Sequence, residues 1–128
     1  MFTGLNVFKM SYAMAVHAGQ RQAIVAQNVA NANTPGYRTR DIESFAKLYQ
    51  GGDAPGMRVS RAGHLNASAS PESSWPVITP DAPTDPNGNS VSVELEMLKA
   101  VEVKRQQDRA LAIYRSSLNI LRTSIGSA

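Results

Sequence analysis

The sequence contains no cysteine, which excludes disulfide scaffolds, thiolate zinc sites and cysteine nucleophiles. Aromatic residues are scarce, since the 128 residues include three Phe, four Tyr and one Trp. A compact core of this size would usually hold more rings, because each buried ring removes about 150–250 Å² from water. Alanine is abundant instead between Ala13 and Ala32, and its short side chain favours close approach of helices.

Long apolar runs are also missing, and no window approaches the roughly 20 apolar residues that span a bilayer. Residues 1–7 lack the basic start and continuous apolar stretch of a cleaved secretory signal, so we expect none. The thirteen Lys and Arg residues give a net charge of +3 but are scattered along the chain. Because nucleic-acid binding depends on clustered cations that release counterions, we expect no nucleic-acid partner.

Residues that could form an active site are few. His17 and His64 lie in different segments, and neither has a second His on the same helix face to suggest a metal site. Glu94 and Glu96 fit the electrostatics of a helix start better than an acid/base pair. Gly51 and Gly52 lack the spacing and Lys of a phosphate-binding loop. We therefore expect no catalytic residue, metal, cofactor or small-molecule substrate.

Apolar residues recur at steps of three and four near both ends of the chain, which is the helical period. In the first segment, the predicted helix-packing residues are Val7, Met10, Met14, Val25 and Val29, with Ala18 and Ala32 on the same stripe. In the last segment, the corresponding residues are Met97, Leu111, Tyr114, Leu118, Leu121 and Ile125. Their spacing is that of a coiled-coil seam, interrupted by polar Lys104 and Gln107.

The predicted fold is mainly α, with long terminal helices paired as an antiparallel coiled-coil-like hairpin. The single domain divides into an N-terminal helix (1–33), a turn and arm (34–50), an irregular Pro/Gly-rich middle (51–90) and a C-terminal helix (91–126). Residues 57–60 and 75–78 are candidate short strands, and the arm is either a short helix or extended. Trp75 is interpreted as a packing anchor in preference to a partner contact.

The boundaries of both helices carry local signals. Ser90 or Ser92 can cap the second helix, whereas Asn31 and Asn33 tolerate the left-handed backbone that ends many helices. Pro35 and Gly36 fit the central positions of a type II turn, which requires a positive φ at the glycine. We therefore predict a sharp bend directly after the first helix.

Residues 27–37, which read Gln-Asn-Val-Ala-Asn-Ala-Asn-Thr-Pro-Gly-Tyr, resemble the signature of the bacterial flagellar basal-body rod protein family. Residues 38–41 and 121–125 are similar to its proximal-rod member, and residues 87–91 with 94–97 resemble the family's entry into its final helix. The resemblance covers about residues 5–50 and 85–126, and it does not extend to residues 71–86. The signature positions of the turn are Asn28, Asn31, Asn33, Thr34, Pro35, Gly36 and Tyr37, and the family often has Asp at the position of Asn33.

The resemblance implies a structural subunit of the proximal rod, assembled by helix packing into the axial shaft that transmits torque from the membrane ring, and no enzyme activity. It implies export by the type III apparatus without a cleaved signal, and a place in the periplasmic rod. The implied partners are other copies of the chain, other rod proteins, the membrane ring protein with its small adaptor, and the export apparatus. From the residues alone, a soluble helical adaptor or chaperone-like binding module and a basic nucleic-acid-binding protein remain as alternatives.

Overall fold

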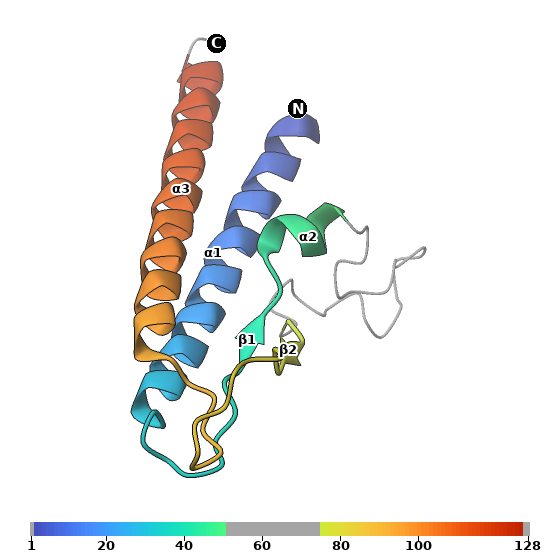
Figure 1. Ribbon diagram of the computed structural model, residues 1–128. Helices are drawn as coiled ribbons and strands as arrows, with labels where there is room; N and C mark the ends of the chain where they lie inside the picture. The colour runs from blue at the N-terminus through green and yellow to red at the C-terminus, as the bar shows by residue number, and fades with distance from the viewer. Residues whose placement is uncertain (1, 51–74, 127–128) are drawn as a thin grey trace.

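Two long helices dominate the computed structural model, which describes residues 2–50 and 75–126 (Figure 1). Helix α1 (Phe2–Ala30) and helix α3 (Val93–Gly126) run antiparallel and pack against each other. Both chain ends lie at one end of this hairpin, which we name the open end, and the two connecting turns lie at the opposite, closed end. The predicted mainly-α hairpin is therefore confirmed. No helix in the described ranges is long and apolar enough to cross a membrane.

Helix α3 begins at a serine cap. The hydroxyl oxygen of Ser92 accepts a hydrogen bond from the backbone N–H of Leu95 at 3.5 Å, in the geometry of an N-cap. The side chain of Ser90 is used elsewhere, because its oxygen accepts from the N–H of Thr39 at 2.8 Å. Of the two predicted caps, Ser92 is therefore the one that starts the helix.

Helix α1 ends without the left-handed residue that the asparagines suggested. Among the described residues only Gly36 and Gly88 have positive φ, so the expectation for Asn31 and Asn33 was wrong. The N–H of Asn31 still reaches the carbonyl of Gln27, and its own carbonyl accepts from the side chain of Asn89 at 2.8 Å. Because a distant side chain satisfies the helix end, no local left-handed turn is required.

The predicted bend follows directly. Gly36 has a φ of +75°, and the N–H of Tyr37 donates to the carbonyl of Thr34 at 3.3 Å. Positive φ at the third position and this closing hydrogen bond are what a type II turn requires. The turn prediction is therefore confirmed.

The arm contains both of the conformations that the sequence left open. Strand β1 (Asp41–Ile42) is extended, and helix α2 (Phe45–Gln50) follows it. Strand β2 (Val77–Ile78) pairs antiparallel with β1, with Ile42 opposite Val77, so the strand predicted within 75–78 is present. The other candidate strand, at 57–60, lies outside the described residues.

The apolar core lies between α1 and the arm. Its buried members are Ile24, Ile42, Phe45 and Trp75. The ring of Trp75 is 4% exposed and contacts the rings of Phe45 and His17 edge-on, with centroids 6.0 and 5.6 Å apart. Such contacts confirm that Trp75 anchors the end of the irregular middle on α1.

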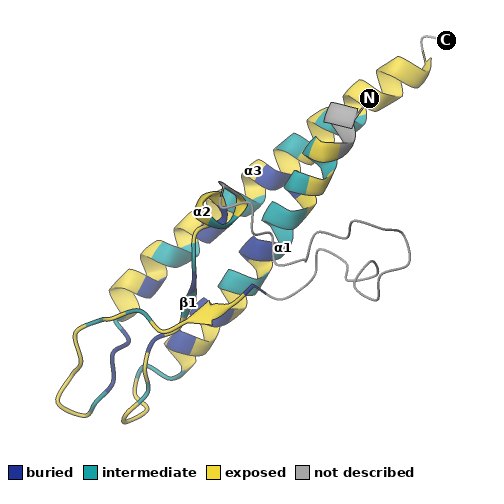
Figure 2. Ribbon diagram, turned by 90° about the vertical axis from the view of Figure 1, so that its right-hand side faces the viewer, coloured by how far each residue is buried: buried dark blue, intermediate teal, exposed yellow. Residues whose placement is uncertain are grey.

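The stripe of residues by which α3 packs on α1 is shifted by one position along the chain from the predicted seam. Its buried and half-buried residues at alternating steps of three and four are Glu96, Lys99, Val103, Gln106, Ala110, Ile113 and Ser117. Small side chains such as Ala110 allow close approach, and the polar members find partners on α1 and the arm. Most of the predicted apolar seam consequently lies on the flank of the pair, although the ring of Tyr114 contacts that of Phe8 on α1 with centroids 5.4 Å apart. The last turns of α3 are exposed (Figure 2).

Candidate functional site

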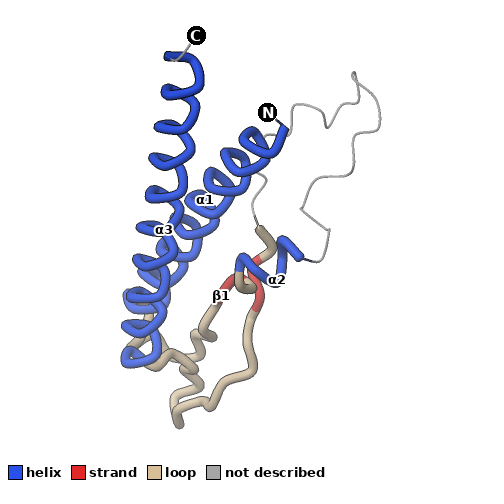
Figure 3. The backbone as a smooth tube through the Cα atoms, turned by 90° about the horizontal axis from the view of Figure 1, so that it is seen from above, coloured by secondary structure: helices blue, strands red, loops and turns tan. Residues whose placement is uncertain are grey.

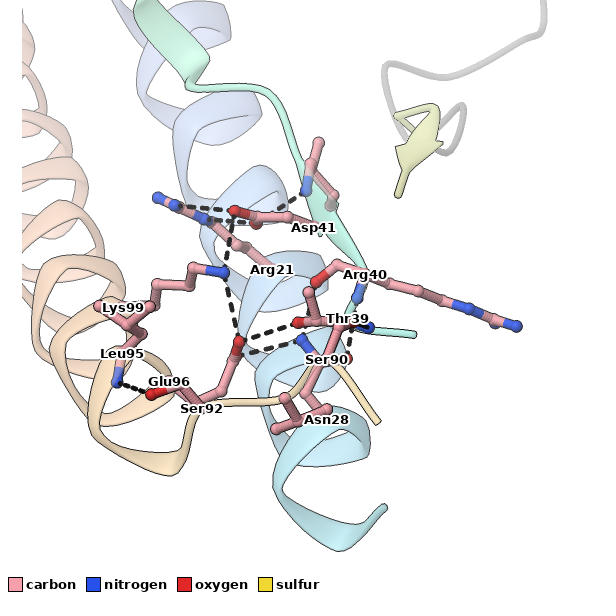
Figure 4. Close-up of polar contacts among 12 residues, drawn as sticks. Arg21, Asn28, Thr39, Arg40, Asp41, Ser90, Ser92, Leu95, Glu96 and Lys99 are labelled. Atoms are coloured by element: carbon pink, nitrogen blue, oxygen red, sulfur yellow. Dashed lines mark hydrogen bonds and ion pairs between the residues drawn. The ribbon is translucent and has the colours of Figure 1, made fainter. Parts of the chain in front are cut away.

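Asn28 joins α1 to the arm and to α3 (Figure 4). Its amide oxygen accepts from the N–H of Arg40 and from the hydroxyl of Tyr37, both at 3.1 Å. Its amide nitrogen donates to the carbonyl of Arg40 at 2.7 Å and to Oε2 of Glu96 at 3.1 Å. A buried amide that uses all its donors and acceptors is strongly fixed, which gives a physical reason for an asparagine at this signature position.

Glu96 is the second centre of this polar cluster and is 1% exposed. Its Oε1 accepts from the hydroxyl of Thr39 at 3.1 Å and from the ammonium of Lys99 at 3.2 Å. A buried carboxylate is tolerated only with such partners. The sequence pattern predicts only a role in helix-start electrostatics for Glu96. The missed signal was its place on the same stripe of α3 as Val103 and Ala110.

Asp41 extends the cluster along the arm. Its carboxylate accepts from Nε of Arg21 at 3.0 Å and from the N–H of Ile42 at 2.8 Å, and Lys99 lies 3.5 Å away. Burial raises the pKa of Asp41, but the Arg21 and Ile42 hydrogen bonds and the Arg21 and Lys99 charges outweigh it, so the pKa is lowered. The arm is thereby bound to both long helices through charged groups.

The second turn, residues 87–90, packs on the signature turn. The side chain of Asn89 donates to the carbonyls of Asn31 and Thr34, each at 2.8 Å. The N–H of Gly36 donates to the carbonyl of Asn87 at 3.0 Å. The sequence predicts each turn but not the contact between them, because about fifty residues separate the two turns and local patterns act within a few residues.

Most signature residues lie at this closed end, and several of them are joined by hydrogen bonds. Thr34 Oγ1 donates to Oδ1 of Asn31 at 3.1 Å, and the Asn31 amide donates to the carbonyl of Gln27. Asn33 and Pro35 are exposed on the bend. The turn therefore fixes how the chain leaves α1 and leaves two of its side chains facing outward.

We expect glycine-to-alanine substitutions at two sites to have opposite effects on the free energy of unfolding. Gly88 has a φ of +84°, and an added Cβ would lie 3.3 Å from Cα of Gly36, so Gly88→Ala should destabilise the protein. Gly19 lies within α1 with nothing within 4 Å of an added Cβ, so Gly19→Ala should stabilise it by roughly 0.5–1 kcal/mol. Urea unfolding followed by circular dichroism measures the stability of both variants. If both substitutions stabilised the protein, or both destabilised it, the prediction would be wrong.

His17 sits at the centre of the core and is completely buried. Its Nε2 lies 2.8 Å from the carbonyl of Glu43, and the amide of Gln106 donates to its Nδ1 at 2.9 Å. These partners fix a neutral ring that donates from Nε2 and accepts at Nδ1. Burial and the charge of Arg21 lower the pKa of His17 and outweigh the opposing effects of the Glu43 carbonyl and Asp41. The ring is therefore a structural group linking α1, the arm and α3.

Acidification should destabilise the protein through His17. Its pKa in the unfolded chain is near 6.5 and is lower in the folded state, so below about pH 6.5 the unfolded chain binds the extra proton. The free energy of unfolding should thus fall as the pH drops through 6.5 toward the folded-state pKa. Melting temperatures between pH 7.5 and 5 test this, and His17→Gln should flatten that slope. An unchanged slope in the variant would assign the pH dependence to other groups.

The predicted helix-packing residues differ in how far the chain covers them. Val25 is buried, Val7, Met10, Met14 and Leu118 are half-buried, and Val29 is 43% exposed. The others on α3 are exposed: Met97 (64%), Leu111 (43%), Tyr114 (44%), Leu121 (38%) and Ile125 (75%). Leu95, Leu98, Val101 and Ile120, which the seam did not include, are also exposed by at least 50%. Apolar surface of this extent along one helix marks a protein–protein contact.

Within the described ranges, no group of three or more His, Asp or Glu side chains could hold a metal ion. The arrangement instead consists of a polar cluster that fixes the closed end and of apolar helix faces that are left uncovered. Such geometry supports assembly by helix packing.

Comparison with known proteins gives consistent matches. The sequence profile described as "Flagella basal body rod protein" matches residues 17–38, which include the signature turn. The chain is 31% identical over 119 residues to "Flagellar basal body rod protein FlgB" of Agrobacterium fabrum, covering 88% of this chain and 87% of that protein. It is 32% identical to FlgB of Salmonella typhimurium (77% and 78% covered) and 31% identical to FlgB of Escherichia coli (73% and 73% covered).

Proposed function

Because the chain belongs to the FlgB family of flagellar basal body rod proteins and is a structural subunit of the rod, we propose that it builds the proximal rod by packing its helices against those of its neighbours. The neighbours are other copies of the chain and other rod proteins. The rod so formed passes torque from the membrane ring to the structures above it. The subunit acts through contacts and carries no enzyme activity.

The observation that supports this proposal is the uncovered apolar seam of α3. Met97, Leu111 and Tyr114 are 64%, 43% and 44% exposed although they follow coiled-coil spacing. At about 25 cal/mol per Å² of apolar surface, burying such a row against another helix is a substantial driving force. On α1, the proposed interface includes Val29, which is likewise exposed.

Family membership further supports a location and a set of partners for this subunit. We place it in the periplasmic rod after export by the flagellar type III apparatus without removal of a leader. At the base of the rod it meets the membrane ring protein and that ring's small adaptor. Purified basal bodies should therefore contain the chain, whereas a cytoplasmic adaptor or chaperone with the same helices would remain in the soluble fraction.

Leu118→Asp should abolish swimming without abolishing synthesis, because it introduces a charge into the apolar seam. The matched control is Asn119→Asp, which adds the same charge one residue later at an exposed position. Soft-agar motility, immunoblots of whole cells and analysis of purified basal bodies measure the effect. Circular dichroism of the purified variants separates failed assembly from failed folding. Normal swimming of Leu118→Asp would show that the seam is not an assembly surface.

A further inference from the structure

The charges of the helix pair are distributed unevenly between its ends. Helix α1 and the part of α3 from Arg109 onward contain no acidic residue. Their cations nearer the open end are Lys9, Arg109, Arg115 and Arg122, whereas Arg21 is paired with Asp41 and Glu102. The glutamates of α3 lie in its first ten residues, at positions 94, 96 and 102. The open end of the hairpin is therefore basic, and acidic side chains of α3 gather toward the closed end.

The two long helices diverge toward the open end (Figures 1 and 3). An apolar groove of about 550 Å³ lies there. Its apolar lining comes from both helices: Val7, Phe8, Ala112, Ile113, Ile120 and Leu121. Exposed Lys9, Arg115 and Arg122 neighbour these lining residues along the chain. We name this surface the basic groove.

A surface of opposite character lies on the first turns of α3. Met97, Leu98 and Val101 are 64%, 62% and 50% exposed and share one face through steps of three and four residues. Exposed Glu94 and Glu102 stand on the same side, each four residues from Leu98. We name these five residues the acidic face.

We propose that the acidic face of one copy of the chain occupies the basic groove of a second copy. The groove offers apolar walls with cations at its margin, and the acidic face offers apolar side chains with carboxylates at its margin. This assignment rests on the proposed rod function and specifies which surfaces of two subunits meet. Opposite charges at the margins select the orientation and oppose the pairing of two like faces.

The consequence for assembly is a repeating, non-closed contact. Because two different surfaces of the same chain meet and the contact shifts each subunit along the helix axis, each added subunit presents a free copy of both surfaces, and growth continues as a helical row. The face is centred near residue 98 and the groove near residue 117. At 1.5 Å per residue, the contact would displace adjacent subunits by about 30 Å along the helix axis.

Disulfide crosslinking tests this contact sharply because the chain has no cysteine of its own. Leu98→Cys lies on the acidic face and Ile120→Cys in the basic groove, and the two positions belong to one helix. They lie about 33 Å apart within a chain, whereas a disulfide needs Cα atoms about 4.4–6.8 Å apart. Any bond between them is therefore intermolecular. A mixture of the two full-length variants should form mixed dimers on mild oxidation, and the double variant should form a ladder of covalent oligomers, in solution and in basal bodies.

Control variants define the contrary outcomes. Lys47→Cys, on the exposed arm, should not pair efficiently with Leu98→Cys. Glu94→Lys and Arg115→Glu should each lower the mixed-dimer yield about two- to fivefold, as expected for exposed charge pairs, and their combination should restore part of it. Pairing of Leu98→Cys with itself, with Lys47→Cys or with a different rod protein at equal yield would overturn the proposal. If the cysteine variants enter basal bodies and swim but never form the 98–120 bond, this contact is wrong while the rod function stands.

Discussion

Asn28→Asp is expected to lower the free energy of unfolding by about 3–5 kcal/mol at neutral pH, the range for breaking a buried charged network. The change keeps the shape of the side chain but removes the amide that donates to Glu96 and to the carbonyl of Arg40. It also sets a second carboxylate 3.1 Å from a buried one. Like charges at this distance disfavour each other strongly, so one carboxyl must take up a proton.

The control for this prediction is the same substitution at Asn33. That residue belongs to the same signature but is exposed, so Asn33→Asp should change the stability by less than about 0.5 kcal/mol. Urea unfolding of the full chain measures both variants. The deficit of Asn28→Asp should decrease as the pH falls from neutral toward about 4, because the folded variant takes up that proton at a higher pH than the unfolded chain does. Equal effects of the two substitutions would show that the cluster does not hold the closed end.

Trp75→Ala is expected to cost about 3–5 kcal/mol, the usual range for removing a large buried aromatic ring. The ring packs against Phe45 and His17, and its removal leaves a cavity in the core between α1 and the arm. The loss should also free Val77–Ile78 from β1, because Trp75 lies only two residues before Val77. Hydrogen exchange at Ile42 and its strand partner should increase more than exchange near Glu96.

Trp75→Phe keeps an aromatic ring at this position but removes the indole nitrogen. Nε1 of Trp75 is buried with no hydrogen-bond partner in the described structure, so its removal sacrifices no bond. The Gln20 side chain contacts the backbone of residue 75 and should be unaffected. Trp75→Phe should therefore cost clearly less than Trp75→Ala. Equal costs would mean that the shape of the indole is essential to the core.

The polar cluster at the closed end and the uncovered apolar faces of α3 depend on different kinds of side chain. The polar cluster at the closed end uses charged and amide groups whose partners must all be present. The uncovered faces of α3 use apolar side chains that tolerate exchange of similar volume. Substitutions in the cluster should therefore reduce stability before assembly is affected. Substitutions such as Leu118→Asp should reduce assembly while much of the fold remains.

The long helices, a serine cap at position 90 or 92 and the positive φ at Gly36 could be predicted from the sequence because each depends on residues close together in the chain. Helical period, caps and turns act within a few residues. The resemblance to rod proteins lay in such a continuous stretch, residues 27–37. Local chemistry therefore determined the fold class, and the family followed from a local motif.

The register of the helix pair was decided only by tertiary structure. The stripe of α3 that faces α1 includes Glu96, Lys99 and Gln106, which a hydrophobic pattern assigns to solvent. These groups can be buried because Asn28 meets Glu96 from 68 residues away, Asp41 meets Lys99, and Met14 and His17 meet Gln106. A polar side chain is stable inside only when its partners are in place, and the order of residues along the chain does not reveal those partners.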